Sequence, residues 1–146
     1  MSADGLTDDA IRALLASVRR IALVGASNKP ARPSNGVMGF LLRHGYQVVP
    51  VNPGLAGQTI HGQRVVASLA EAGPIDMVDV FREASATPTI ARQAVAAGAR
   101  ALWLQLGVLN EEAATIARVG GLVFVEDRCP AIEIPRLRIA PVGGRP

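Results

Sequence analysis

The sequence has a single cysteine, few aromatic residues and no long apolar run. With Cys129 as its one cysteine the chain cannot form an internal disulfide, which agrees with a reducing, cytoplasmic location. No run of about 18 apolar residues occurs, so we expect no membrane span. The polar, acidic stretch 1–9 lacks the pattern of a secretory signal.

The charge pattern does not favour a nucleic acid as partner. Net charge is +3, but the arginines are scattered along the chain, and aromatic residues make up only 3% of it. Proteins that bind nucleic acids gather their cations into a stripe, often with aromatic residues between them. We therefore expect an arginine-rich surface in contact with solvent and no nucleic-acid partner.

Residue types that carry metal or acid–base chemistry are sparse and far apart. The two histidines, His44 and His61, have no ligand spacing with each other or with Cys129, so we expect no metal site. No histidine lies near Cys129 in the sequence, and no pair of carboxylates can be assigned to catalysis. We predict no catalytic residues. A reduced, structural Cys129 is favoured over the alternative, a thiol-based acyl or redox enzyme that uses it.

Strand-like and helix-like stretches alternate along the whole chain. Short apolar runs lie at 21–24, 47–51, 76–81, 101–104 and 122–125, with a further short strand expected at 63–66. Helical patterns lie between them at 7–18, 34–44, 68–72, 87–98 and 110–120, with Thr7, Ser34, Thr87 and Asn110 as expected N-caps. This alternation predicts an α/β fold: a Rossmann-like, doubly wound parallel sheet of about five strands with helices on both faces, in three layers.

We expect one domain over residues 1–146, because no linker or repeat divides the chain. From Pro130 onward the prolines and glycines predict a tail without regular structure, with residues 138–146 as a candidate for mobility. The apolar residues of this tail include Ile132 and Ile134. They either cover the sheet or form a contact with a second copy or an unknown protein partner, so a homodimer stays open.

The loop after the first strand has the features of an anion site. The strand 21–24 ends at Gly25, small residues follow, and Lys29 and Arg32 precede the start of a helix near Ser34. Free N–H groups in such a turn and the dipole of the following helix favour negative charge. Two cations in the loop suit a ligand with several phosphate groups.

A nicotinamide dinucleotide is the first ligand to consider for this fold, but two features disfavour it. The fingerprint G-x-G-x-x-G is missing after the first strand, since the glycine that follows Gly25 is Gly36. The second strand ends at Asn52, where an NAD site needs a carboxylate for the ribose hydroxyls. An NAD(P)-dependent oxidoreductase remains as an alternative. No P-loop sequence occurs either.

Several short motifs resemble those of the small stand-alone CoA-binding domain proteins, which are similar in fold to the CoA-binding domain of the succinyl-CoA synthetase alpha subunit. In chain order these motifs are Gly25-Ala26-Ser27, Arg32-Pro33-Ser34, Gly45-Tyr46, Pro50-Val51-Asn52-Pro53, Asp79-Val80-Phe81-Arg82, Leu102-Trp103-Leu104-Gln105-Leu106-Gly107-Val108, Asn110-Glu111-Glu112-Ala113-Ala114 and Asp127-Arg128-Cys129. The resemblance spans roughly Leu14 to Leu137. The order and spacing of the motifs, more than any one of them, carry it.

The resemblance implies that the chain binds coenzyme A, or an acyl-CoA, at the carboxyl edge of the sheet. By position, it assigns Gly25, Ala26 and Ser27 to the pyrophosphate, Lys29, Arg32 and Ser34 to phosphate oxygens, Val51, Asn52 and Pro53 to the adenosine, Val80, Phe81 and Arg82 to the opposite wall, and Leu104, Gln105 and Gly107 to the pantetheine arm. The synthetase reaction is not expected, because neither histidine lies in the context of the phosphorylated histidine of that enzyme. We therefore expect binding without catalysis.

Overall fold

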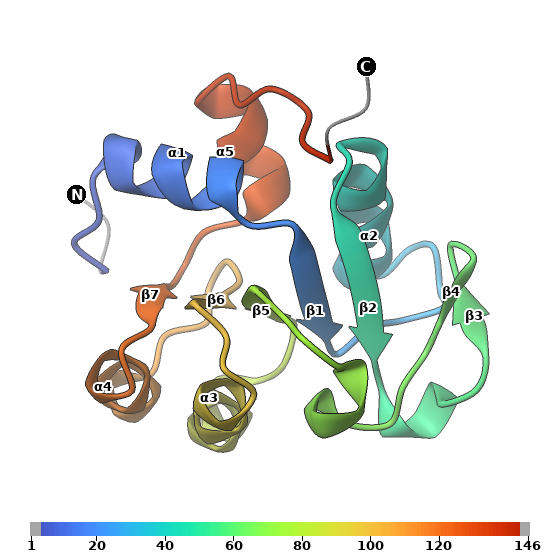
Figure 1. The fold of residues 1–146 in the computed structure, drawn as a ribbon. Helices are drawn as coiled ribbons and strands as arrows, with labels where there is room; N and C mark the ends of the chain where they lie inside the picture. The colour runs from blue at the N-terminus through green and yellow to red at the C-terminus, as the bar shows by residue number, and fades with distance from the viewer. Residues whose placement is uncertain (1–3, 144–146) are drawn as a thin grey trace.

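A parallel sheet of five strands forms the centre of the molecule (Figure 1), in a computed structural model that describes residues 4–143. The strand order is β2-β1-β5-β6-β7, and every neighbouring pair is parallel. The strands are β1 (Arg20–Val24), β2 (Gln47–Val51), β5 (Met77–Val80), β6 (Ala101–Leu104) and β7 (Val123–Val125). This architecture confirms the predicted fold class.

Helices cover both faces of the sheet and make the outer two layers (Figure 1). One face carries α1 (Asp8–Ser17), α2 (Pro33–Arg43) and α5 (Pro130–Arg136), and the other carries α3 (Thr87–Ala96) and α4 (Glu111–Val119). Alternate residues of β1 therefore enter two separate cores: Ile21 and Leu23 pack in one, Ala22 and Val24 in the other. A strand buried on both faces explains the uniformly apolar runs. None of the described helices has the length and apolar character needed to span a membrane.

Most of the short elements lie between β2 and β5 in the chain. A small antiparallel hairpin consists of β3 (Thr59–Ile60) and β4 (Gln63–Arg64). Three 3-10 helices lie at Pro53–Leu55, Leu69–Ala72 and Ala84–Ala86. The strand expected at 63–66 is thus only two residues long, although Val66 adds one isolated parallel bridge to Val51.

The expectation of an irregular tail from Pro130 is wrong over its first part, because that part is helix α5. Pro130 suits the first turn of a helix, where its missing N–H costs nothing. Ile134 is buried in the core with α1 and α2, whereas Ile132 is half exposed. Further on, Ile139 is buried and the N–H of Val142 donates to the carbonyl of His44 at 2.8 Å. Residues 144–146 lie outside the described part of the chain.

The predicted helix starts are right at two positions and wrong at two. The side chains of Thr7 and Asn110 accept hydrogen bonds from the N–H groups of Ala10 and Ala113, so both are N-caps. Helix α2 instead begins at Pro33, with Arg32 as its N-cap. Proline at the first helical position has the right φ, so the helix starts before Ser34. Helix α3 similarly begins at Thr87 itself.

The strand order places a switch point between β1 and β5. The chain goes from β1 to β2 on one side, then returns to β5 on the other side of β1. The loops that leave β1 and β5 therefore run in opposite directions and open a crevice at the carboxyl ends of the strands. Ligands of open α/β sheets bind at such a crevice.

Asn110 and Ser34 were both expected to cap helices, but replacing them should change stability by different amounts. Asn110→Ala removes a real cap and should lower the free energy of unfolding by about 1–2 kcal/mol. Ser34→Ala removes a hydroxyl that makes no capping bond and should change it by less than about 0.5 kcal/mol. Urea denaturation of both variants beside the wild type measures this. Equal losses would contradict the observed start of α2.

Candidate functional site

A cleft of about 780 Å³ lies at this switch point. The loop after β1 and the first turn of α2 form one side, and the residues that follow β2, β5 and β6 form the other. Its lining residues are Gly25, Ala26, Ser27, Asn28, Lys29, Arg32, Pro33, Ser34, Val37, Asn52, Gly54, Leu55, Phe81, Arg82, Gln105, Leu106, Val108 and Cys129. We call this space the arm cleft.

A second cleft of about 500 Å³ lies beside the arm cleft and shares residues with it. Val51, Pro53, Leu69 and Ile90 contribute apolar surface there. Its lining residues in common with the arm cleft are Gly25, Asn52 and Arg82. We call it the side cleft; the two clefts together make one elongated site with its junction at the end of β1.

Most of the residues assigned to the site from the sequence line one of these clefts. Val51 and Pro53 line only the side cleft. Val80 is fully buried and lines neither cleft. Gly107 also lies outside both clefts, and its N–H donates to Asp127 Oδ1 at 2.7 Å. Leu104 is also fully buried and lines neither cleft. The remaining assigned residues line the arm cleft.

Gly25 brings the loop close to the neighbouring strand. Its φ is +90°, a conformation that residues with a side chain rarely adopt, and a Cβ there would lie 2.3 Å from the carbonyl oxygen of Phe81. The positive φ disfavours, and the short distance to Phe81 excludes, a residue with a side chain at position 25. The loop can therefore cross directly over the end of β5.

Of the three residues that the resemblance assigns to the pyrophosphate, only Ser27 has an N–H group without a partner among the described residues. The N–H groups of Gly25 and Ala26 both donate to the carbonyl of Val51, at 3.0 and 3.3 Å, and are not available. Within residues 4–143, the N–H groups of Ser27, Asn28 and Ser34 have no hydrogen-bond partner. These three belong to residues that line the arm cleft.

Two asparagine side chains orient the peptide groups of this loop. Asn52 Nδ2 donates to the carbonyl of Ala26 at 2.8 Å, and Asn35 Nδ2 donates to the carbonyl of Ser27 at 2.8 Å. In a trans peptide the C=O and the following N–H point in opposite directions. The N–H groups of Ser27 and Asn28 therefore point away from the two asparagines. Asn35 was not identified from the sequence.

Three cations line the site: Lys29 and Arg32 line the arm cleft, and Arg82 lines both clefts. Lys29 and Arg32 are exposed, and neither side chain forms an ion pair or hydrogen bond with the rest of the described chain. Arg82 pairs with Glu83 at 3.0 Å, but both side chains are largely in solvent. Such a pair contributes little stability, so an anionic ligand can compete for Arg82.

A buried carboxyl group that sequence reasoning did not assign to the site is hydrogen-bonded to Gln105, a lining residue of the arm cleft. Asp79 lies on β5 and is 0% exposed. Its Oδ1 accepts a hydrogen bond from Gln105 Nε2 at 2.6 Å, and its Oδ2 has no partner within the described residues. Burial raises the pKa of Asp79 to about 7, while the bond from Gln105 acts in the opposite direction. An acidic residue inside an apolar strand was the available signal.

Cys129 also lines the arm cleft and is mostly buried. Burial raises the pKa of its thiol, and the nearby Asp79 carboxyl adds to this. The thiol is therefore held in its protonated, less nucleophilic form, as expected of a structural cysteine.

Comparisons with known proteins agree with this architecture. The sequence model of the family described as "CoA binding domain" matches residues 19–135. The uncharacterized protein YneT of Bacillus subtilis (strain 168) is 37% identical over 120 residues, which cover 82% of this chain and 87% of YneT. These matches confirm the family resemblance inferred from the motifs.

Solved structures share this fold at more than 35% sequence identity. A hypothetical protein from Pyrococcus horikoshii OT3 has 41% identity and a TM-score of 0.89, over 94% of this chain and 96% of that one. The protein described as cell-free ID.343 from Thermus thermophilus has 36% identity and a TM-score of 0.86, over 90% and 99% of the two chains.

The buried Asp79 predicts a pH dependence of stability. Its pKa in the folded state is above the ordinary 3.8, so its favourable contribution is complete below about pH 4 and is lost as pH rises toward 7. Asp79→Asn cannot ionise and keeps an acceptor for Gln105. Relative to the wild type, its free energy of unfolding should therefore rise by roughly 2–4 kcal/mol across that range and stay level above it.

Urea denaturation of both proteins from pH 4 to pH 8 measures this difference. A constant difference between the variant and the wild type across the range would show that Asp79 has an ordinary pKa in the folded protein.

Proposed function

Because this chain belongs to the CoA binding domain family, we propose that it binds coenzyme A, or an acyl-CoA, across the two clefts and has no catalytic activity of its own. The observation that carries the proposal is the loop after β1. There, N–H groups and two cations that have no partner among residues 4–143 line the arm cleft of an elongated site. A long ligand with several phosphate groups near its middle matches that arrangement.

The phosphate groups account for the polar half of the site. In our proposal the diphosphate accepts hydrogen bonds from the N–H groups of Ser27 and Asn28 in the loop after β1 and of Ser34 in the first turn of α2. Lys29 and Arg32 then neutralise phosphate charge from the rim. Charge-assisted bonds of this kind are about twice as strong as neutral ones.

The two clefts account for the two ends of the ligand. The side cleft, with Val51, Asn52 and Pro53, takes the adenosine. Arg82 lies at the junction, within the part of the site where the ribose phosphate would lie. The arm cleft, between Phe81 and Gln105, takes the pantetheine arm.

A nicotinamide dinucleotide fits the same surface less well. Asn52 stands at the end of β2, and both ends of its amide are already engaged, with Ala26 and with the N–H of Gly54. Asn52 is not the carboxylate that an NAD site needs there, and its amide is held by the protein rather than left for the ribose hydroxyls. NADH is the competing ligand in the test below.

Calorimetric titration of the wild type with CoA, dephospho-CoA and NADH tests the proposal. We expect CoA to bind in the micromolar range or tighter, dephospho-CoA several-fold more weakly, and NADH most weakly. The double variant Lys29→Ala/Arg32→Ala should bind CoA at least about tenfold more weakly, because two charge-assisted contacts are lost.

A matched control removes the same charge elsewhere. Arg64 and Arg138 are exposed and line neither cleft, so Arg64→Ala/Arg138→Ala should keep the wild-type affinity for CoA. Tighter binding of NADH than of CoA would refute the proposal, as would equal losses in the two double variants.

A further inference from the structure

We propose that Asp79 is a positioning residue: it holds the Gln105 amide so that the amide oxygen faces the arm cleft and accepts a hydrogen bond from an N–H group of the ligand. The inference rests on the proposed function and deepens it. It makes the floor of the arm cleft selective for a ligand that carries a secondary amide, such as the pantetheine arm of CoA.

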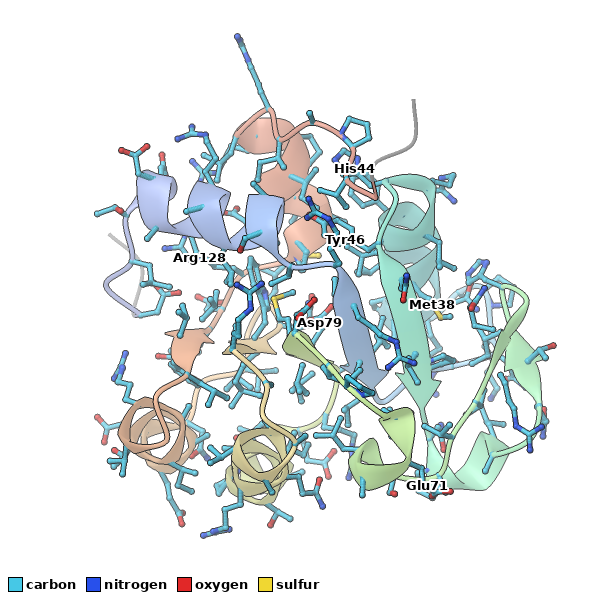
Figure 2. The ribbon with its side chains drawn as sticks, viewed as in Figure 1. Met38, His44, Tyr46, Glu71, Asp79 and Arg128 are labelled. Atoms are coloured by element: carbon cyan, nitrogen blue, oxygen red, sulfur yellow. The ribbon has the colours of Figure 1, made fainter. Side chains whose placement is uncertain are left out.

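The sheet brings the two residues together from neighbouring strands. β5 and β6 pair in parallel with Asp79 opposite Trp103, and Gln105 directly follows the end of β6. Asp79 lies on the side of β5 toward α1 and α5 (Figure 2). Gln105 is 7% exposed and lines the arm cleft, so it forms a layer between the buried carboxyl and the cleft.

The hydrogen bond between them decides which end of the amide faces the ligand. A glutamine side chain has a donor end and an acceptor end that differ only by a flip. Gln105 Nε2 is committed to Asp79 Oδ1 at 2.6 Å. The Gln105 oxygen has no partner in the described part of the chain and is not among its buried unpaired atoms, so it is accessible from the cleft. An ionised carboxylate can only accept, so in that state Asp79 bonds the NH₂ end of the amide and leaves the oxygen end for the cleft.

The fold does not need a carboxyl group at this position. Asp79 Oδ2 is buried without a partner within residues 4–143, an arrangement that destabilises the folded state. The sheet neighbours of Asp79 are Leu23 and Trp103, both fully buried apolar residues. An apolar side chain would suit these surroundings. Holding the amide of Gln105 is a role that an apolar residue cannot perform.

The walls of the arm cleft match the proposed partner. Val37, Leu106 and Val108 offer apolar surface along it, and the Gln105 oxygen is an acceptor beside them. The pantetheine arm has the complementary pattern, with secondary amides separated by methylene groups. An N–H group that reached this oxygen would satisfy an acceptor that is otherwise left without a partner in a mostly apolar space.

Binding of CoA and of 3′-phospho-ADP, which is CoA without its pantetheine arm, separates this role from general damage. We expect Gln105→Met to weaken CoA about tenfold and to leave 3′-phospho-ADP unchanged, because only the arm loses its acceptor. Asp79→Leu should do the same. Asp79→Asn keeps an acceptor for Gln105 and should restore CoA affinity to within about threefold of the wild type.

The double variant Asp79→Leu/Gln105→Met tests whether Asp79 acts through Gln105. We expect it to bind CoA no more weakly than Gln105→Met alone, since the residue to be positioned is already gone. In the wild type, the side-chain amide protons of Gln105 should exchange with solvent more slowly than those of an exposed glutamine. That measurement holds even if Asp79→Leu does not fold.

Four results would overturn the inference and leave the proposed function intact: unchanged CoA affinity in Gln105→Met, additive losses in the double variant, equal losses of CoA and 3′-phospho-ADP in Asp79→Leu, or fast exchange of the Gln105 amide. A wild type that binds 3′-phospho-ADP but gains nothing from the arm would also overturn it. A wild type that binds neither ligand would refute both proposals.

Discussion

The contact between Gly25 and the end of β5 is the constraint on which the site depends. A Cβ at residue 25 would lie 2.3 Å from the Phe81 carbonyl oxygen, so only glycine allows β1 to end so close to its neighbour. From there the loop bonds back to Val51 of β2 and leads into α2. One residue thus sets how the first loop crosses the switch point of the sheet, and the two clefts meet at that residue.

The hydrogen bonds of this loop leave a specific set of donors for a ligand. Val51 takes the N–H groups of Gly25 and Ala26, and the side chains of Asn35 and Asn52 take two carbonyls. The N–H groups that remain belong to Ser27 and Asn28 in the loop and to Ser34 at the start of α2. They lie near Lys29 and Arg32, which no carboxylate neutralises within the described residues. The same frame that binds dinucleotides in other Rossmann-like proteins is here electropositive, with a neutral residue at the end of β2.

Local sequence signals predicted the fold because they agree with one another along most of the chain. Alternating apolar runs and helical patterns indicated the parallel sheet, and Thr7 and Asn110 marked true helix caps. Helix α5 was missed because it is short, contains Pro135, and is held by packing against α1 and α2 rather than by its own propensity.

The features of the site that sequence analysis missed all arise from contacts between distant residues. Which N–H groups stay free depends on Val51, Asn35 and Asn52, and the pairing of Asp79 with Gln105 depends on the register of β5 and β6. No local pattern encodes these contacts. The loop after β1, which the sequence marks as a candidate anion site, does line the arm cleft. A glycine at a strand end followed by small residues and cations is a local signal, so it could be found from the sequence.

A crystal structure of the protein with CoA tests the central claim most directly. The account predicts diphosphate oxygens within hydrogen-bond distance of the N–H groups of Ser27, Asn28 and Ser34, with the adenosine in the side cleft and the pantetheine arm in the arm cleft. Clear density for CoA at another surface, or a diphosphate that makes no contact with this loop, would contradict it.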